Sequence, residues 1–314
     1  MTRLDVVTLG ETMVSLRTGT PLRLGGTLSM TMAGAESNVA IGLTRLGHAV
    51  RWGGRVGADE LGAYILRTLR AESVAVDTVV VDPERSTGLM LAERRVADVS
   101  RVSYYRAGSA GSAFSAADAA ASLAEAPRIL HLTGITPALS ASAAEAVSEA
   151  VRLARRAGAL VSVDVNYRSK LWPPEEARPV LSELVRSAHI VIASEDELAL
   201  VAPEDESRAA DDLAASGVTQ LVIKRGARGA TVWHDGEEHH AAAIRIPVLD
   251  TIGAGDAFTA GYLSGVLDGL PPAAALSRGT ATGAFAVAAL GDWEGLPTRD
   301  ELALLDAKAG ATLR

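Results

Sequence analysis

The chain has 314 residues, enough for one large α/β domain with a small appendage or for two domains. Its 48% hydrophobic and 22% charged residues are typical of a globular protein, and its net charge of −8 argues against a nucleic-acid partner. The absence of cysteine excludes disulfides, thiolate nucleophiles and cysteine-ligated zinc. We expect a cytoplasmic protein without a membrane partner, because Asp5 interrupts the first apolar run and no apolar segment approaches the roughly 20 residues of a membrane span.

The first third of the sequence predicts short strands that form a small sheet. Residues 12–16 and 28–32 alternate apolar with polar or small side chains, as half-buried strands do. In the second of these strands, Leu28, Met30 and Met32 fall on one face. A small sheet with apolar residues to bury usually needs a second layer, so we expect a homodimer or a higher homo-oligomer through this sheet.

Two further strands, 87–93 and 101–106, are joined by a short connection and predict a hairpin. By period-two alternation, Tyr104 and Arg106 share one face, with Tyr105 on the other. A tyrosine and an arginine on one face suit the recognition of a polar, anionic small molecule, because arginine offers a two-pronged match to a carboxylate. Taken singly, either side chain could equally be a solvated residue of an edge strand.

From residue 128 onward, strand and helix patterns alternate along the chain. The predicted strands are 128–132, 160–164, 189–193 and 220–224, and the helices are 141–157, 174–187, 195–201 and 207–216. This alternation predicts a doubly wound, mostly parallel sheet flanked by helices. Ligands of such sheets lie at the carboxyl ends of the strands. Three groups fall there: Arg168, the acidic turn from Ser194 to Glu197, and the glycine-containing loop from Lys224 to Gly229.

Residues 250–261 read Asp-Thr-Ile-Gly-Ala-Gly-Asp-Ala-Phe-Thr-Ala-Gly and predict a sharp turn between a strand and a helix. The strand is predicted over 244–249 and the helix over 257–267. Gly253, Ala254 and Gly255 would leave backbone N–H groups unpaired in front of the helix dipole, and this arrangement suits a transferring phosphoryl group. Asp256 beside it could accept a hydroxyl proton. Alternatively, Asp256 only caps the helix.

Several motifs, in this order along nearly the whole chain, resemble the PfkB (ribokinase-like) family of carbohydrate kinases. They are Gly34 to Asn38, residues 55–62, Ser194 to Glu197, Lys224 to Gly229, and Gly253 to Asp256. The runs 104–110, 133–139 and 164–168 are most similar to the 2-keto-3-deoxygluconate kinases. Three positions depart from the family's pattern: Ala33 stands where a glycine is common, Ser194 replaces asparagine, and Met90 stands where some relatives have tyrosine.

The resemblance implies a role for each motif on the sugar side. Asp256 would be the catalytic base, and the amides of Gly253, Ala254 and Gly255 would stabilise the phosphoryl oxygens. The sugar would be contacted by Gly34, Asn38, Tyr104, Arg106, Arg168, Asp256 and Asp292. Without the family context, Gly34 and Asn38 would suit a capped strand-to-helix turn equally well.

On the nucleotide side, the resemblance implies ATP and Mg²⁺. Glu197 would organise the water shell of Mg²⁺, although an acid at that position also suits the helix dipole. ATP would be bound by Ser194, Lys224, Gly226, Gly229, Gly253 and Gly255. The family pattern also allows a K⁺ ion near Asp250. It implies a single ribokinase-like domain, 1–314, with a lid inserted from 11–32 and 87–107.

These observations lead to the hypothesis of an ATP-dependent kinase that phosphorylates the 6-hydroxyl of 2-keto-3-deoxygluconate. A fructokinase or another sugar kinase of the family is the first alternative, and a non-catalytic sugar-binding protein on the same fold is the second. A dinucleotide oxidoreductase would need G-x-G-x-x-G, but Phe258 stands where the third glycine belongs. A P-loop kinase would need G-x-x-x-x-G-K-[ST], which the sequence lacks.

Overall fold

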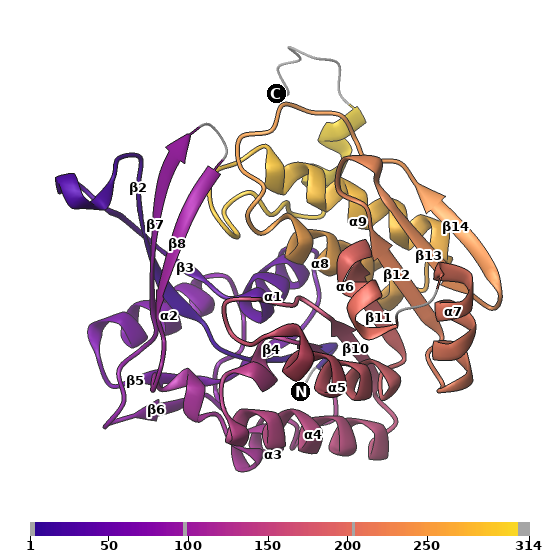
Figure 1. Ribbon diagram of the computed structural model, residues 1–314, viewed down its shortest axis with the longest axis horizontal. Helices are drawn as coiled ribbons and strands as arrows, with labels where there is room; N and C mark the ends of the chain where they lie inside the picture. The colour runs from indigo at the N-terminus through magenta and orange to yellow at the C-terminus, as the bar shows by residue number, and fades with distance from the viewer. Residues whose placement is uncertain (1–3, 97–98, 203–204, 307–314) are drawn as a thin grey trace.

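The computed structural model describes residues 4–96, 99–202 and 205–306 (Figure 1). At its centre lies an eight-stranded sheet. In spatial order, its strands are β14 (Glu237–Ala241), β13 (Ala230–His234), β12 (Gln220–Lys224), β11 (Ile190–Ser194), β10 (Leu160–Asp164), β9 (Ile129–Thr133), β1 (Val6–Leu9) and β4 (Val50–Gly53). Neighbouring strands from β12 to β4 pair in parallel, whereas β13 and β14 are antiparallel. The predicted doubly wound, mostly parallel sheet is confirmed.

Helices cover both faces of this sheet and form one apolar cluster on each side. One cluster includes side chains of α1 (Ala35–Arg45), α2 (Glu60–Ala71), α8 (Ala254–Leu267) and α9 (Pro272–Val287). The other includes side chains of α3 (Ala116–Ser122), α4 (Ala141–Arg156), α5 (Pro174–Arg186), α6 (Glu195–Val201) and α7 (Glu206–Ala215). Strands buried on both faces read as nearly continuous apolar runs, which is why their positions could be predicted.

A second, four-stranded sheet stands beside the carboxyl ends of the central strands (Figure 1). Its spatial order is β3 (Ser29–Ala33), β2 (Met13–Thr18), β7 (Leu89–Val96) and β8 (Val99–Tyr105). The two hairpin pairs are antiparallel and β2 pairs with β7 in parallel, so the small sheet is mixed. The shorter elements are β5 (Arg55–Gly57), β6 (Val80–Asp82) and the 3₁₀ helices η1 (Leu22–Leu24), η2 (Gly111–Ala113), η3 (Thr136–Ala138), η4 (Gly226–Arg228) and η5 (Asp300–Asp306).

The strand predicted over 244–249 is wrong. Residues 242–249 lie outside any strand; Pro247 lacks a backbone N–H for a ladder, and the Leu249 N–H donates instead to the carbonyl of Val287 in α9, at 2.7 Å. On β3, Met32 is fully buried whereas Met30 is 49% exposed, so part of the predicted apolar face is left uncovered within one copy of the chain.

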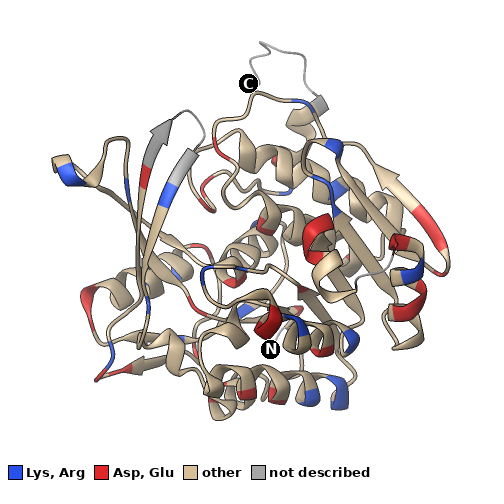
Figure 2. Cartoon of the chain, viewed as in Figure 1, with Lys and Arg blue, Asp and Glu red and all other residues tan. Residues whose placement is uncertain are grey.

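None of the helices within the described ranges is long and apolar enough to cross a bilayer. Acidic and basic side chains are interspersed over the chain (Figure 2).

Candidate active site

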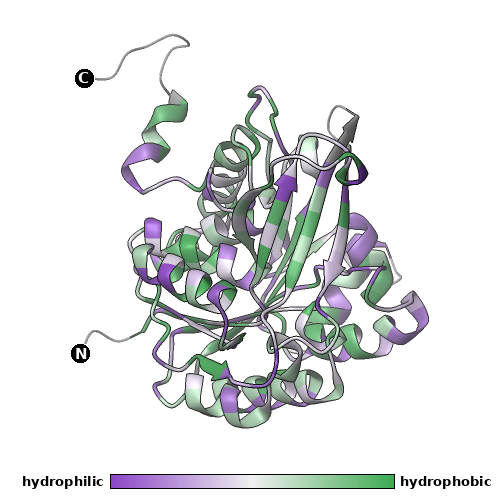
Figure 3. Cartoon of the chain, turned by 90° about the vertical axis from the view of Figure 1, so that its left-hand side faces the viewer, coloured by the Kyte–Doolittle hydropathy of each residue, from purple (hydrophilic) through white to green (hydrophobic). Residues whose placement is uncertain are grey.

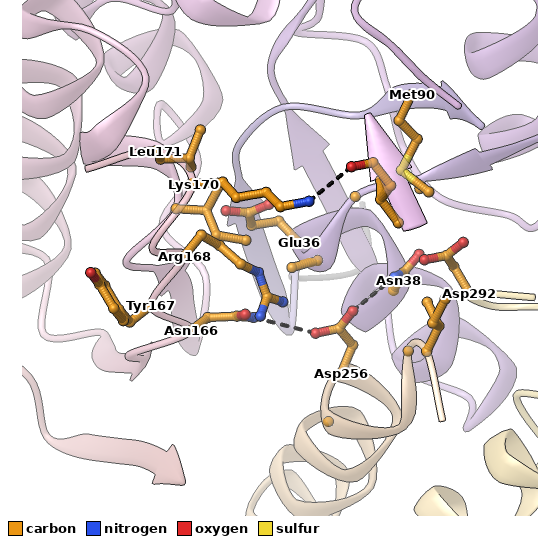
Figure 4. A pocket seen from close by; sticks show the side chains of 18 of the residues that line it. Glu36, Asn38, Met90, Asn166, Tyr167, Arg168, Lys170, Leu171, Asp256 and Asp292 are labelled. Carbon is orange, nitrogen blue, oxygen red and sulfur yellow. Dashed lines mark hydrogen bonds between the residues drawn. The ribbon is translucent and has the colours of Figure 1, made fainter. Parts of the chain in front are cut away.

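A cavity of about 630 Å³ lies between the carboxyl edge of the central sheet and the small sheet. It brings together most of the residues predicted from the sequence (Figure 4). Those that line it are Gly34, Asn38, Tyr104, Arg106, Arg168, Ser194, Glu197, Lys224, Gly253, Gly255, Asp256 and Asp292. Ala254, Gly226 and Gly229 are not among the residues that line it.

The turn at Gly253 presents backbone donors to this cavity. Gly253 has φ +76° and is the N-cap of α8, and a Cβ atom there would collide with the carbonyl oxygen of Asp292, so both the conformation and the space require glycine. Within the described chain, the N–H groups of Gly253, Gly255 and Asp256 have no acceptor. Free donors at the positive end of a helix dipole form an anion site.

Asp256 points into the cavity from the first turn of α8 (Figure 4). Asn38 Nδ2 donates to its Oδ2 at 2.8 Å, and Asn166 Nδ2 lies 3.5 Å from its Oδ1. Burial raises the pKa of Asp256 to about 6; the hydrogen bond from Asn38 opposes this and the charge of Asp164 adds to it. The alternative that Asp256 only caps α8 is wrong, because the capping position is Gly253. A carboxylate with this pKa can serve as a base near neutral pH.

A buried ion pair lies next to this first turn. Lys224 Nζ lies 2.6 and 2.9 Å from the two carboxylate oxygens of Asp164, which also accepts from Thr259 Oγ1 at 3.0 Å. Burial lowers the pKa of Lys224, but the negative charges of Asp164, Glu197 and Asp256, with the hydrogen bond to Asp164, together outweigh burial and raise the pKa. A Cβ atom on Gly255 would lie 3.5 Å from Lys224 Nζ, so the ammonium group lies close to the free amides. A fixed cation there reinforces the anion site.

Glu197 caps α6 and lines the cavity at the same time. Its Oε2 accepts from the Ser194 N–H at 2.7 Å and its Oε1 from the Tyr167 N–H at 3.0 Å. Capping and metal binding are therefore compatible roles, since each oxygen keeps a second lone pair. Among the residues placed by the structure, no group of three or more His, Asp or Glu side chains could hold a metal ion.

The other end of the cavity carries positive charge. The Tyr104 ring lies 5.8 Å from the guanidinium of Arg106 and 5.9 Å from the ammonium of Lys170. Lys170 also donates to the carbonyl of Val102 in the small sheet, at 2.8 Å, and Arg168 reaches in beside Asn166 (Figure 4). Tyr105 is 62% exposed and is not among the lining residues, as the period-two alternation predicts.

Asp292 lies 7% exposed at the edge of the cavity, where Arg17 of β2 pairs with it. Arg17 also reaches Asp250, with Nη1 3.2 Å from Oδ2. Burial raises the pKa of Asp292 to about 7, although Arg17 acts to lower it. The small sheet thus contacts both chain segments that form the Gly253 turn.

Sequence reasoning missed five further polar residues of the site: Glu11, Arg17, Glu36, Asn166 and Lys170. Glu36 is buried, accepts from Thr133 Oγ1 and Thr136 Oγ1 at 2.6 and 2.8 Å, and has a pKa raised by burial. Glu11 and Asn166 follow central strands, so the strand-end rule could have identified them. Arg17 sits in a lid strand, where the sequence carries no signal for its distant partners.

A doubly wound sheet, an anion-binding turn at its carboxyl edge and a neighbouring base under a small sheet define a phosphotransferase acting on a small hydroxyl-bearing substrate. The family model described as "pfkB family carbohydrate kinase" matches residues 3–299. The chain belongs to this family, and it is an ATP-dependent carbohydrate kinase.

Three relatives illustrate the similarity. The 2-dehydro-3-deoxygluconokinase of Bacillus subtilis is 38% identical over 96% of this chain and 95% of its own length. The crystal structure of 2-dehydro-3-deoxygluconokinase from Thermotoga maritima has a TM-score of 0.88 at 25% identity, covering 96% of this chain and 98% of that one. A protein from E. coli described as a ribokinase II, solved with ATP and Mg²⁺, has a TM-score of 0.90 at 25% identity, covering 96% and 99%.

Proposed function

We propose that this kinase transfers the γ-phosphoryl group of ATP to the 6-hydroxyl of 2-keto-3-deoxygluconate. The observation that carries the proposal is the cationic end of the cavity, where Tyr104, Arg106, Arg168 and Lys170 surround the space left for the sugar. A neutral hexose has no charge to pair with these cations, whereas a sugar acid presents a carboxylate to them. The names of the Bacillus subtilis and Thermotoga maritima relatives point to the same substrate.

In the proposed reaction, the sugar lies with its carboxylate toward the arginines and its 6-hydroxyl toward Asp256. Asp256 takes up the hydroxyl proton as the oxygen attacks the γ-phosphorus and the bond to ADP breaks. The free amides of Gly253, Gly255 and Asp256 and the ammonium of Lys224 stabilise the charge on the transferring group. The Ala254 N–H donates to the Thr251 carbonyl at 3.4 Å and is not one of these donors. Asn38 holds the carboxylate of Asp256 in place, and Asp292 accepts from a sugar hydroxyl.

The residues on the nucleotide side fit ATP with Mg²⁺, which the similar E. coli structure contains. Mg²⁺ supplies charge neutralisation to the phosphates and usually keeps several waters, so the single carboxylate of Glu197 is a suitable partner. Ser194 and Lys224 face the same space. In the loop with Gly226 and Gly229, Arg225 and Arg228 are paired with glutamates, so the loop would offer ATP mainly its backbone.

A K⁺ ion near Asp250 would have to share that carboxylate with Arg17. Turnover measured in K⁺, Na⁺ and tetramethylammonium salts of equal ionic strength tests for such a site. A strict requirement for K⁺ would support it, and equal turnover in all three salts would refute it.

The outer face of the small sheet supports a homodimer. Leu28 is 38%, Met30 49% and Tyr105 62% exposed, and the strand pairing puts Tyr105 on the face opposite Tyr104, which lines the cavity. The small sheet faces the viewer in Figure 3. A second copy of the sheet would cover these side chains. Light scattering with size exclusion tests this, and Met30→Lys should shift the protein toward the monomer.

Coupled ADP-release assays test the function directly. The enzyme is supplied with ATP and Mg²⁺ and with 2-keto-3-deoxygluconate, fructose, ribose or no sugar. We expect kcat/KM for the sugar acid to exceed that for either neutral sugar by at least about a hundredfold, as the loss of a charged contact in a polar site implies. A preference for fructose would favour the alternative kinase, and no turnover with any sugar would favour the binding protein.

A further inference from the structure

The small sheet is joined to the rest of the chain by four crossings, and Glu11 contacts all of them. It lies in the crossing from β1 to β2, and its carbonyl packs on Gly34, where β3 leads into α1. Its carboxylate packs on Gly88, just before β7, and on Gly111, which follows β8. A Cβ atom would lie 2.7 Å from Glu11 O at Gly34 and 2.6 Å from Glu11 Oε1 at Gly88, and closer still at Gly111. Because Gly34, Gly88 and Gly111 have no side chains, Glu11 has the space to lie among the crossings.

From this position, Glu11 holds Arg106. Arg106 Nε donates to Glu11 Oε2 at 2.7 Å, its Nη2 lies 2.5 Å from the same oxygen, and Ser109 Oγ donates to Oε1. Glu11 is only 3% exposed. Arg106 Nη1 has no hydrogen-bond partner in the part of the chain that the structure places, while Arg106 lines the cavity. One edge of the guanidinium is therefore fixed, and Nη1 remains available to a ligand in the cavity.

We propose that Glu11 is a positioning residue for the anionic end of the sugar and that it acts through Arg106, an inference that rests on the proposed function. A long arginine side chain without a partner would sample many rotamers and lose entropy on binding. Glu11 removes that freedom before the substrate arrives. Because the same carboxylate also contacts the crossings at Gly88 and Gly111, the recognition of the acid is coupled to the position of the small sheet.

A double-mutant cycle separates this role from a general structural one. KM and kcat are measured for the wild type, Glu11→Gln, Arg106→Ala and the double variant, with 2-keto-3-deoxygluconate and with 3-deoxyfructose, which carries a hydroxymethyl group in place of the carboxylate. Glu11→Gln should raise KM for the acid about tenfold and leave KM for ATP within about twofold. In the Arg106→Ala background, the same change should raise KM for the acid less than about twofold.

Glu93 offers a matched control, because it is likewise a buried glutamate but lies within β7 of the small sheet. It accepts from the Leu22 N–H at 2.8 Å and lies 3.7 Å from Arg101, and it is not among the lining residues of the cavity. Glu93→Gln should leave KM for both sugars within about twofold. If Glu11→Gln does not fold, Ser109→Ala loosens Glu11 from its other side, and the cycle is run with Ser109→Ala and Arg106→Ala.

The proposal is overturned if the Glu11 change raises KM equally in both backgrounds, or equally for the acid and the neutral sugar. A wild-type enzyme without activity on the acid would instead refute the proposed substrate. The cycle would then be run on the sugar that it accepts, where additive effects of the two changes would still overturn the coupling of Glu11 to Arg106.

Discussion

Asn38 Nδ2 lies 2.8 Å from Asp256 Oδ2, so the first turns of α1 and α8 meet at the carboxylate that would take up the proton. The two residues are 218 positions apart in the sequence. The hydrogen bond favours the charged form of Asp256 and opposes the effect of burial on its pKa. Asn38 thus has a role in tuning the base, in addition to any contact with the sugar.

This relationship predicts a change in pH dependence. Asp256 must be ionised to act as a base, so kcat/KM of the wild type should fall as the pH falls through about 6. Asn38→Ala removes a hydrogen bond to the charged form, which raises the pKa, so the acid limb should move up by roughly half a pH unit. Ser37→Ala is the control, because Ser37 Oγ donates to the Gly34 carbonyl and not to Asp256. An unmoved limb in Asn38→Ala would contradict the prediction.

The Lys224–Asp164 pair predicts that stability and activity can be separated. Lys224→Met should lower the free energy of unfolding by about 3–5 kcal/mol, because Asp164, with a side chain only 2% exposed, would lose its buried counter-charge. The double variant Asp164→Asn/Lys224→Met has no buried charge and should recover most of that loss. Its kcat should still be at least about a hundredfold below wild type, because the cation beside the anion site is gone.

Chemical denaturation and steady-state assays on both variants check this prediction. Recovery of kcat in the double variant would show that Lys224 acts only in packing.

The conformation of the turn at Gly253 predicts that a substitution there lowers kcat. Gly253→Ala combines positive φ with a collision against the Asp292 carbonyl, so it should distort the free amides and lower kcat by about a hundredfold. Gly269 is the matched control, because it also has positive φ, +72°, but a Cβ atom there meets open space. Gly269→Ala should cost about 1 kcal/mol of stability and leave kcat unchanged. Equal losses of kcat in the two variants would contradict the role of the turn.

The ionised side chain of Asp256 should destabilise the folded protein, so its effect on stability depends on pH. Its pKa is raised from 3.8 to about 6, so its ionised form is disfavoured in the folded state. This destabilisation of the folded state is absent at pH values below 3.8, the pKa in the unfolded chain. It develops as the pH rises from 3.8 to about 6 and is complete above about 6. Asp256→Asn should therefore raise the free energy of unfolding at pH 7.5 by up to about 3 kcal/mol, and by little at pH 4. Denaturant unfolding at both pH values checks this; a gain of equal size at both would contradict it.

The fold could be predicted where local pattern and tertiary environment agree. The parallel strands of the central sheet are buried on both faces and read as apolar runs, and strand–helix alternation then implies the doubly wound topology. Residues 244–249 show the limit of this reasoning. They are apolar in alternation, but with Pro247 among them they form no strand, and the Leu249 N–H donates to the carbonyl at the end of α9.

The site could be predicted in part for a related reason. Arg168 and Glu197 follow central strands, where one topological rule brings side chains together. Asp256 follows the glycine turn before α8 and was predicted from that motif. Arg17 and its partner Asp250 are 233 residues apart, and their contact depends on how the small sheet closes over the cavity. No local sequence pattern specifies how the small sheet closes over the cavity, so these contacts could be identified only from the three-dimensional structure.

The most direct test of the account is the turnover of Asp256→Asn with its binding of ATP measured alongside. The substitution keeps the shape of the side chain and its contact with Asn38 but removes the proton acceptor. We predict that kcat falls by about a thousandfold or more while the Kd for ATP stays within about twofold of wild type. Turnover near the wild-type value would contradict the assignment of Asp256 as the base.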